Sequence, residues 1–118
     1  MPSKLYVVTR QDLTPGAQIA QSAHAALKFS YEHTEIFRKW HDESQYLICL
    51  SVPDEDALLD FMDEVWRRKL KYSYFVEPDF GDEHTAVCIE PGFRTSNLCQ
   101  GLPLALKEIG EGQLLRMV

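Results

Sequence analysis

Two polar side chains in the first third of the sequence, Gln21 and His24, are of types that carry acid–base and hydrogen-bonding chemistry. They lie three residues apart in a segment predicted to be helical, so they share one helical face. An imidazole can gain or lose a proton near neutral pH, and a side-chain amide can orient a carbonyl or a water molecule. Gln21 suits equally a structural role as a bridge from helix to strand. A lone histidine on a helix is more often a packed, hydrogen-bonded side chain than a catalyst, which favours a structural or positioning role for His24.

Asp79 and Thr85 lie further along the chain, in and just after a segment rich in turn-forming residues. The carboxylate of Asp79 is suited to act as a base toward water, although its place after Pro78 is also that of an ordinary turn residue. Thr85 can donate a hydrogen bond to an oxyanion or a phosphate, and a β-branched residue in a strand also needs no such function.

The helix that carries Gln21 opens with Thr14 and Gly16, where exposed backbone N–H groups form an anion site. Simple capping of the helix by Thr14 accounts for the same residues. Candidate contacts to phosphate groups are the basic residues Arg10, Lys28, Arg67, Arg68, Lys69 and Lys71. The cluster at 67–71 also balances the negative end of a helix dipole, which is sufficient reason for its charge.

Composition excludes several classes of protein. The chain has 118 residues, 45% of them hydrophobic and 25% charged, which suits one globular domain with its own core. Its net charge of −6 gives no long-range attraction to nucleic acid, so RNA binding requires a local basic patch. No apolar run approaches the roughly 20 residues of a membrane span, and no secretion signal is present, which predicts a cytoplasmic protein without a membrane partner.

The three cysteines, Cys49, Cys88 and Cys99, have no metal-ligand spacing, and their odd number argues against a disulfide framework. Cys49 and Cys88 fall inside apolar strand segments, which favours buried, unreactive side chains. The sequence therefore predicts neither a metal site nor a catalytic thiol.

Strands that alternate with helices must position these side chains. The predicted strands cover 5–9, 46–51, 72–76 and 85–90, and the predicted helices cover 14–30, 33–42, 57–70 and 95–106, although Pro103 disfavours the end of the last helix. The loop 77–83 is too short for a crossover, so the last two strands either pair antiparallel or lie apart. The prediction is a single α/β domain over residues 1–118, with a four-stranded mixed sheet flanked by helices on both faces.

Hydrophobic patterns also predict which side chains face the core. The first strand should be central and buried on both faces. The apolar face of the first helix should comprise Ile19, Ala20, Ala23, Leu27 and Phe29, and that of the helix 57–70 should comprise Leu58, Phe61, Met62, Val65 and Trp66. Helical spacing favours packing over base stacking for Trp40 and Trp66, whereas Phe93 remains a stacking candidate.

Three sequence blocks, in order, resemble the type-II peptidyl-tRNA hydrolases. GAQIAQSAHAA at 16–26 resembles that family's G-K-x-A-A-Q-C-x-H-A, which also follows an apolar strand and a short loop. VPDEDAL at 52–58 looks like its A-P-D-E-x-x-L, and TAVCIEPG at 85–92 looks like its T-V-L-G-I-G-P-G. Together the blocks cover most of the domain.

The resemblance implies an enzyme that hydrolyses the ester joining a peptide to the 3′ end of tRNA, without a metal or cofactor, and often as a homodimer. Ester hydrolysis needs an activated water and donors for the oxyanion. By position, Asp79 would activate the water, with Glu77 and Asp82 as alternatives for this acid. Gln21 and His24 would position the reactants and Thr85 would assist the oxyanion. The acceptor end of peptidyl-tRNA would be bound by Thr14, Gly16, Arg10 and Lys28.

Two departures from the family pattern stand out. Ala17 occupies the position of the family's lysine at the helix start, and the loop 78–83 is shorter than the family's loop. This variant pattern is similar to the peptidyl-tRNA hydrolase domain-containing branch. The alternative function is therefore a non-catalytic module that binds RNA or protein and keeps only the fold.

Overall fold

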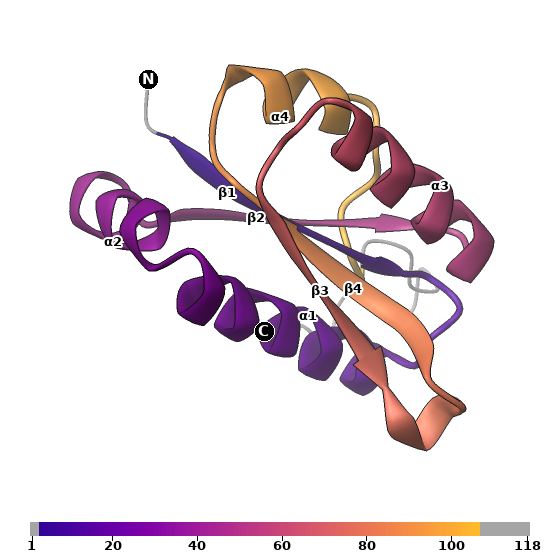
Figure 1. The fold of residues 1–118 in the computed structure, drawn as a ribbon. Coiled ribbons are helices and arrows are strands. Elements are labelled where there is room, and N and C mark those ends of the chain that lie inside the picture. Colours follow the sequence, from indigo (N-terminus) through magenta and orange to yellow (C-terminus); the bar gives the residue numbers. More distant parts are fainter. Residues whose placement is uncertain (1–2, 107–118) are drawn as a thin grey trace, which may run out of the picture.

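A twisted four-stranded sheet forms the centre of the computed structural model, which describes residues 3–106 (Figure 1). Its strands are β1 (Lys4–Arg10), β2 (Tyr46–Val52), β3 (Tyr72–Glu77) and β4 (Glu83–Ile89), in the order β2-β1-β4-β3. β1 pairs parallel with β2 and antiparallel with β4, and β3 pairs antiparallel with β4. The predicted mixed sheet is confirmed, and its last two strands form an antiparallel hairpin.

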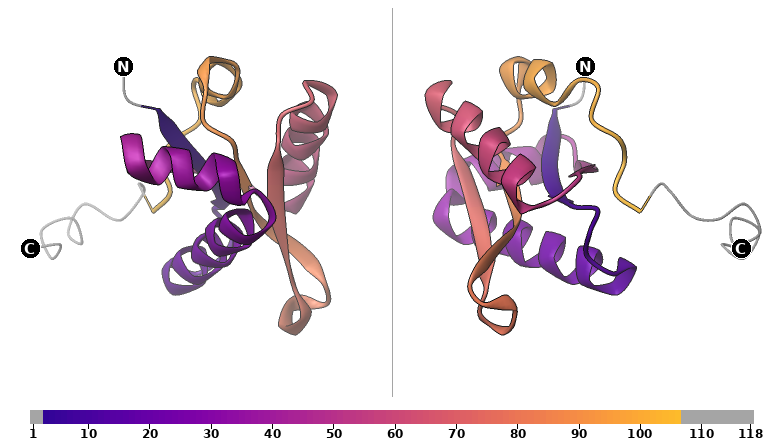
Figure 2. Two further views of the ribbon diagram at one scale, coloured as in Figure 1. Left: turned by 60° about the vertical axis from the view of Figure 1, so that its left-hand side comes forward. Right: turned by 90° about the vertical axis from the view of Figure 1, so that its right-hand side faces the viewer.

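Helices cover both faces of this sheet, as the sequence predicts. They are α1 (Pro15–Glu32), α2 (Thr34–Glu43), α3 (Glu55–Arg67) and α4 (Phe93–Cys99). Figure 2 shows α1 and α2 on one face and α3 and α4 on the other. None of the helices within residues 3–106 is long and apolar enough to cross a membrane.

β1 is buried along both faces, which confirms its predicted central place. Tyr6 and Val8 point into a core closed mainly by α3, while Leu5 and Val7 point into a second core closed by α1 and α2. Trp40 of α2 belongs to the second core, as predicted, and its indole N–H donates to the carbonyl of Tyr46 at 2.9 Å. The alternation of β1 side chains thus joins the two helical layers.

Side-chain caps fix where two of the helices begin. The hydroxyl of Thr14 accepts a hydrogen bond from the backbone N–H of Ala17 at 3.3 Å, and Pro15 follows as the first helical residue. The carboxylate of Asp54 accepts from the N–H of Ala57 at 3.0 Å and begins α3 in the same way. Such caps stabilise a helix by about 1 kcal/mol each.

The predicted apolar face of α1 is wrong for every residue except Phe29. Ile19 is 60% exposed and Leu27 is 67% exposed, and Ala20 and Ala23 are exposed beside them. The buried residues of α1 are Gln18, Gln21, Ala25 and Phe29. The inward hydrogen bonds of the two glutamine amides fix this rotation of the helix, because a buried amide must find partners.

Trp66 was predicted to pack in the core and is instead 67% exposed. The buried face of α3 consists of Leu58, Met62 and Val65. At 100° per residue, Trp66 lies about 80° from the centre of that face, beyond its edge. α3 also ends at Arg67, three residues before its predicted end.

The last helix, α4, ends at Cys99, so the predicted helical residues 100–106 are wrong. Gly101 has a φ of +90°, and Pro103 cannot continue a helix. The chain then runs along the outer edge of β2, where Ser51 N–H donates to the Pro103 carbonyl at 2.8 Å.

Of the two cysteines predicted to be buried, Cys88 is buried and Cys49 is only half-buried. Cys99 is buried as well, and all three are free thiols. Burial raises the pKa of Cys99 to about 12 and raises the pKa values of Cys88 and Cys49 as well. Since the thiolate is the reactive form, these values disfavour thiol chemistry at neutral pH.

Candidate functional site

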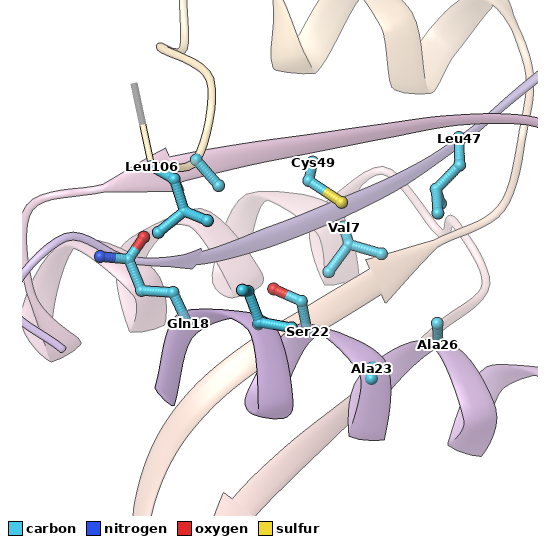
Figure 3. Close-up of a pocket in the computed structure, with 10 residues that line it drawn as sticks. Val7, Gln18, Ser22, Ala23, Ala26, Leu47, Cys49 and Leu106 are labelled. Carbon is cyan, nitrogen blue, oxygen red and sulfur yellow. The ribbon is translucent and has the colours of Figure 1, made fainter. Parts of the chain in front are cut away.

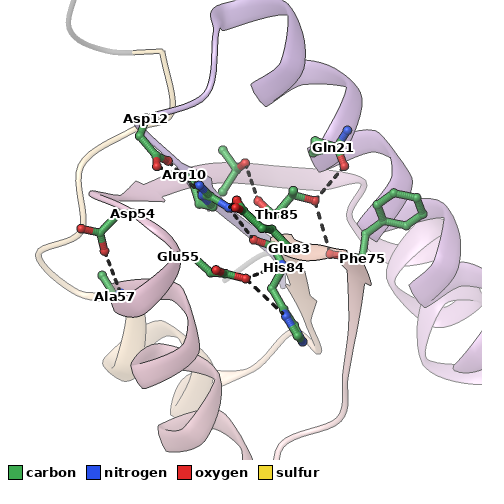
Figure 4. Close-up of polar contacts among 11 residues, drawn as sticks. Arg10, Asp12, Gln21, Asp54, Glu55, Ala57, Phe75, Glu83, His84 and Thr85 are labelled. Atoms are coloured by element: carbon green, nitrogen blue, oxygen red, sulfur yellow. Dashed lines mark hydrogen bonds and ion pairs between the residues drawn. The ribbon is translucent and has the colours of Figure 1, made fainter. Parts of the chain in front are cut away.

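The side-chain amide of Gln21 joins α1 to the two strands of the hairpin. Its nitrogen donates to a carboxylate oxygen of Glu77, on β3, at 2.8 Å. Its oxygen accepts from the hydroxyl of Thr85, on β4, at 2.7 Å (Figure 4). The donor on one side and the acceptor on the other fix the orientation of the amide, with its NH₂ group toward the carboxylate.

Thr85 is wholly buried, and its environment uses its only hydroxyl proton. The hydroxyl lies 2.7 Å from the Gln21 oxygen and 3.3 Å from the Phe75 carbonyl, so the shorter contact to Gln21 is favoured. The backbone carbonyl of Thr85 accepts from the hydroxyl of Thr9 at 2.9 Å. In this arrangement Thr85 orients Gln21 and offers no proton to a bound oxyanion.

Glu77 is a half-exposed carboxylate at the end of β3. The Gln21 amide, the Asp79 backbone N–H at 3.3 Å and the nearby His24 together hold the pKa of Glu77 below its usual range. Hydrogen bonds to the charged form are the principal cause. Glu77 is therefore an ionised carboxylate at neutral pH with an open side toward solvent.

His24 is exposed and stacks on the ring of Phe75, with centroids 4.3 Å apart and planes 11° apart. Phe75 lies two residues before Glu77 on the same face of β3, so the stack holds the imidazole beside the carboxylate. Gln21, His24 and Thr85, three of the predicted site residues, therefore lie with Glu77 where α1 meets the β3–β4 hairpin.

The hairpin turn between β3 and β4 places the remaining acids outside this network. Pro78–Phe80 form a single 3₁₀ turn, in which the backbone N–H of Asp79 bonds to Glu77 while its side chain is exposed. Asp82 has a φ of +62° and lies exposed in the same turn. Of the three acids considered, Glu77 contacts the α1 motif, and the role of Asp79 stays a prediction.

Arg10 is engaged by two carboxylates at the end of β1. Its guanidinium donates to both oxygens of Asp12 at 2.9 and 2.8 Å, to Glu83 at 2.7 Å and to the His84 carbonyl at 3.1 Å (Figure 4). Its side chain is only 7% exposed. These bonds fasten β1 to the start of β4, and they lower the pKa of Asp12, chiefly through the hydrogen bonds from Arg10.

Lys28 follows His24 by one turn of α1 and is exposed. Its ammonium lies 5.3 Å from the centre of the Tyr74 ring, which in turn stacks on His84 at 5.1 Å. By contrast, Arg67 and Arg68 pair with Asp63 and Glu64 on α3, on the opposite side of the sheet from α1. Lys28 is thus the basic side chain that extends the face carrying His24.

The N-terminus of α1 offers little free donor capacity for an anion. Thr14 already accepts from the N–H of Ala17, and Pro15 has no N–H. Gly16 is exposed, and a Cβ added there would meet no atom within 4 Å. Substrate binding by Thr14 and Gly16 stays a prediction.

Sequence reasoning missed how several neighbours hold the site. Phe75 and Asp12 carry no motif, and only the folded hairpin brings them to His24 and Arg10. Glu77 stood among the alternatives because the shortened loop leaves the position of the family's acid ambiguous. Within residues 3–106, no group of three or more His, Cys, Asp or Glu side chains is arranged to hold a metal ion.

Comparison with known proteins assigns the family. The model of the family "Peptidyl-tRNA hydrolase PTH2" matches residues 3–98, which is most of the chain. No curated protein matches the chain significantly. Among solved structures, a protein of unknown function, Atu0240 from Agrobacterium tumefaciens strain C58, is similar in fold, with a TM-score of 0.65 and 13% identity over 88% of this chain and 98% of that one. The match over residues 3–98 shows that the chain belongs to the peptidyl-tRNA hydrolase PTH2 family.

Proposed function

We propose that this protein hydrolyses the ester bond of peptidyl-tRNA and releases free tRNA and peptide. The observation that carries the proposal is the network in which Thr85 orients Gln21 and Gln21 orients the carboxylate of Glu77, next to His24. Membership of the PTH2 family supports the same reaction. An ionised, oriented carboxylate beside an imidazole is suited to general-base hydrolysis of an ester.

In the proposed mechanism, Glu77 takes a proton from a water molecule as the water oxygen attacks the ester carbonyl. The carbonyl oxygen becomes an oxyanion, and donors for it are the second N–H of the Gln21 amide and the imidazole of His24. Collapse of the tetrahedral intermediate breaks the bond to the ribose 3′ oxygen, which receives the proton held by Glu77. Thr85 acts as a positioning residue, in place of the oxyanion role that its type suggested.

The proposal assigns the base to Glu77 and keeps Asp79 as the alternative. Glu77 is favoured because its carboxylate accepts from the α1 residue Gln21 at 2.8 Å, whereas Asp79 contacts Glu77 through its backbone N–H and its side chain is exposed. The two residues are neighbours at the start of the same 3₁₀ turn, so a substrate bound at this face can reach either carboxylate. Variants of the two therefore separate the assignments.

For substrate binding, we assign Lys28 to a phosphate of the acceptor end. It lies one turn beyond His24 on α1, so a ribose ester held at Glu77 places the adjoining phosphate on the side of Lys28. Arg10 supports the site indirectly by holding β1 to the hairpin. The proposal also includes action in the cytoplasm, where translation produces the substrate, and assembly as a homodimer.

A direct assay tests the proposed reaction. The protein is incubated at micromolar concentration with tRNA that carries a labelled, N-blocked aminoacyl group, and the released label is measured. We expect turnover well above spontaneous hydrolysis, and a loss of about 100-fold or more when His24 and Glu77 are replaced together by Ala. Absence of turnover by the wild-type protein would refute the reaction.

One observation favours a second function, namely binding of RNA or protein without catalysis. Ala17 stands in the first turn of α1 where the family pattern has a lysine, so this turn lacks a cation beside the substrate. The binding function predicts that deacylated tRNA or a partner protein binds while the ester stays intact, and that Ala17→Lys does not produce turnover. Hydrolysis gained by Ala17→Lys would contradict it.

A further inference from the structure

An apolar groove of about 270 Å³ lies between α1 and the edge strand β2 (Figure 3). Its walls are mainly apolar and include Val7, Ala23, Leu47 and Cys49. The groove borders β1 and β2, whereas Glu77 and Thr85 belong to β3 and β4 on the other side of the sheet order. An open apolar groove of this kind is characteristic of a surface that binds a partner.

Gln18, which lines the groove beside Leu106, has a polar atom without a partner among the described residues (Figure 3). Gln18 is 7% exposed, and its amide nitrogen donates to the Leu13 carbonyl at 2.9 Å. Its amide oxygen is buried and has no hydrogen-bond donor among the described residues. Buried polar atoms are nearly always hydrogen-bonded. A segment that occupies the groove is therefore expected to donate an N–H group to this oxygen.

The chain itself enters the groove at its last described residues. Ala105 N–H donates to the Cys49 carbonyl at 2.9 Å, and Leu104 pairs antiparallel with Leu50 of β2. Ala105 and Leu106 then line the groove. The described chain therefore ends at the rim of the groove, after running antiparallel to β2.

We propose that residues 107–118, which lie outside the described residues, bind in this groove and donate a backbone N–H to the oxygen of Gln18. Their sequence supplies apolar side chains that match the walls, namely Ile109, Leu114, Leu115, Met117 and Val118. The two basic residues, Lys107 and Arg116, balance the two acidic ones, Glu108 and Glu111. An extended segment in the groove carries unpaired backbone N–H groups, one of which can meet the Gln18 oxygen.

A second copy of the chain is the competing occupant, because the neighbouring side chains Ile19 and Leu27 are also exposed and apolar. The covalently attached segment is favoured by its position. A short tether gives an effective concentration in the millimolar range, far above that of a second copy in a micromolar solution. This inference does not depend on the proposed hydrolysis.

The thiol of Cys49 reports directly on whether the groove is filled. It lines the groove and is half-buried, whereas Cys88 and Cys99 are buried elsewhere in the core. The experiment measures the alkylation rate of Cys49 by iodoacetamide in the full chain, at low micromolar concentration and at alkaline pH, because the raised pKa of this thiol makes the reaction slow at neutral pH. Mass spectrometry identifies the labelled site. A Cys49→Ser variant establishes the background from the other two thiols.

Two matched variants of the full chain decide the outcome. Leu114→Asp with Leu115→Asp should expel the segment and raise the alkylation rate of Cys49 at least about tenfold. Gly112→Asp with Gln113→Asp adds the same charge next to these positions and should leave Cys49 protected. Addition of a synthetic peptide of residues 107–118 to the first variant should restore protection.

Two results would overturn the proposal. One is an equal alkylation rate in the wild type and in the Leu114→Asp, Leu115→Asp variant. The other is protection of Cys49 that appears only as protein concentration rises and a dimer forms, because this would assign the groove to a second copy.

Discussion

At the scale of single residues, the orientation of one amide decides what the candidate site offers a substrate. The hydroxyl of Thr85 fixes the Gln21 oxygen, which turns the NH₂ group toward Glu77. If the amide were reversed, its oxygen would face the carboxylate of Glu77 and that contact would become repulsive. The Thr85 hydroxyl would then have to accept from the amide and donate only to the Phe75 carbonyl, over the longer distance of 3.3 Å. Thr85 thus influences the carboxylate through Gln21, from a position that is wholly buried.

The variant Thr85→Val tests this chain of contacts, because it keeps the shape of the side chain and removes the hydroxyl. We expect a loss of about 1–3 kcal/mol in the free energy of unfolding, since the Gln21 oxygen is left without its donor. We also expect kcat to fall while KM changes little, because the orientation of Glu77 is lost. Urea unfolding and steady-state kinetics measure the two effects.

Thr85→Ser is the matched control for that variant. It retains the hydroxyl, so kcat should stay close to the wild-type value even if the missing methyl group reduces stability. Equal values of kcat for Thr85→Val and wild type would show that the hydroxyl does not position the site.

The residue types and spacing of the α1 motif suffice to predict that Gln21 and His24 share a face, and the structure bears this out. The acid that joins them could not be predicted in the same way. Glu77 and Asp79 are two residues apart, and the choice depends on where β3 ends and on the 3₁₀ turn that follows. Neither feature has a signal in the sequence that separates one carboxylate from the other.

At the scale of elements, side-chain hydrogen bonds rotate α1 and fasten the strands around it. Sequence periodicity predicts the helix itself correctly, but α1 has both an apolar stripe through Ile19 and Leu27 and a mixed stripe through Gln18 and Phe29. Hydrophobicity alone favours the first stripe. The glutamine partners that favour the second stripe, Leu13 O, Glu77 and Thr85, come together only in the folded chain.

The Arg10–Asp12 pair predicts how stability at this edge responds to pH. The pKa of Asp12 is lower in the folded chain than its ordinary value of 3.8, so the unfolded chain binds more protons below that pH. The stabilisation by Asp12 is therefore complete above about pH 4 and is lost as the pH falls through the folded value. Urea midpoints measured between pH 7 and pH 2 should decrease accordingly.

Asp12→Asn should lower the urea midpoint at pH 7 and make its decrease with acid shallower, because the titrating group is gone. The exposed Asp60 of α3 provides a control, and Asp60→Asn should leave the pH profile unchanged. A parallel profile for Asp12→Asn and wild type would mean that the pair does not stabilise the fold.

At the scale of the whole molecule, a protein with a net negative charge must bind the polyanionic tRNA through a small number of basic side chains. The net charge is −6, and Arg10 is already paired with Asp12 and Glu83, which leaves Lys28 as the cation proposed to face the acceptor end. The mixed α/β fold with helices on both faces could be predicted from the alternation of strand and helix patterns. The distribution of charge over the surface could not, because it depends on which basic groups find carboxylate partners.

This charge distribution predicts a weak salt dependence of tRNA binding. With one or two phosphate contacts, the Kd for deacylated tRNA should rise only about threefold to sevenfold between 50 and 200 mM salt. Lys28→Ala should weaken binding and reduce that dependence further. A fall in affinity of a thousandfold over the same range, measured by fluorescence titration, would reveal an extensive basic interface that this account lacks.

The central claim is that the carboxylate of Glu77 activates water for ester hydrolysis, and a comparison of two isosteric variants tests it most directly. Single-turnover hydrolysis of N-blocked aminoacyl-tRNA is measured for wild type, Glu77→Gln and Asp79→Asn under identical conditions. We predict that Glu77→Gln lowers the rate by about 100-fold or more, while Asp79→Asn stays within about threefold of wild type. The reverse order, with Asp79→Asn inactive and Glu77→Gln active, would contradict the account.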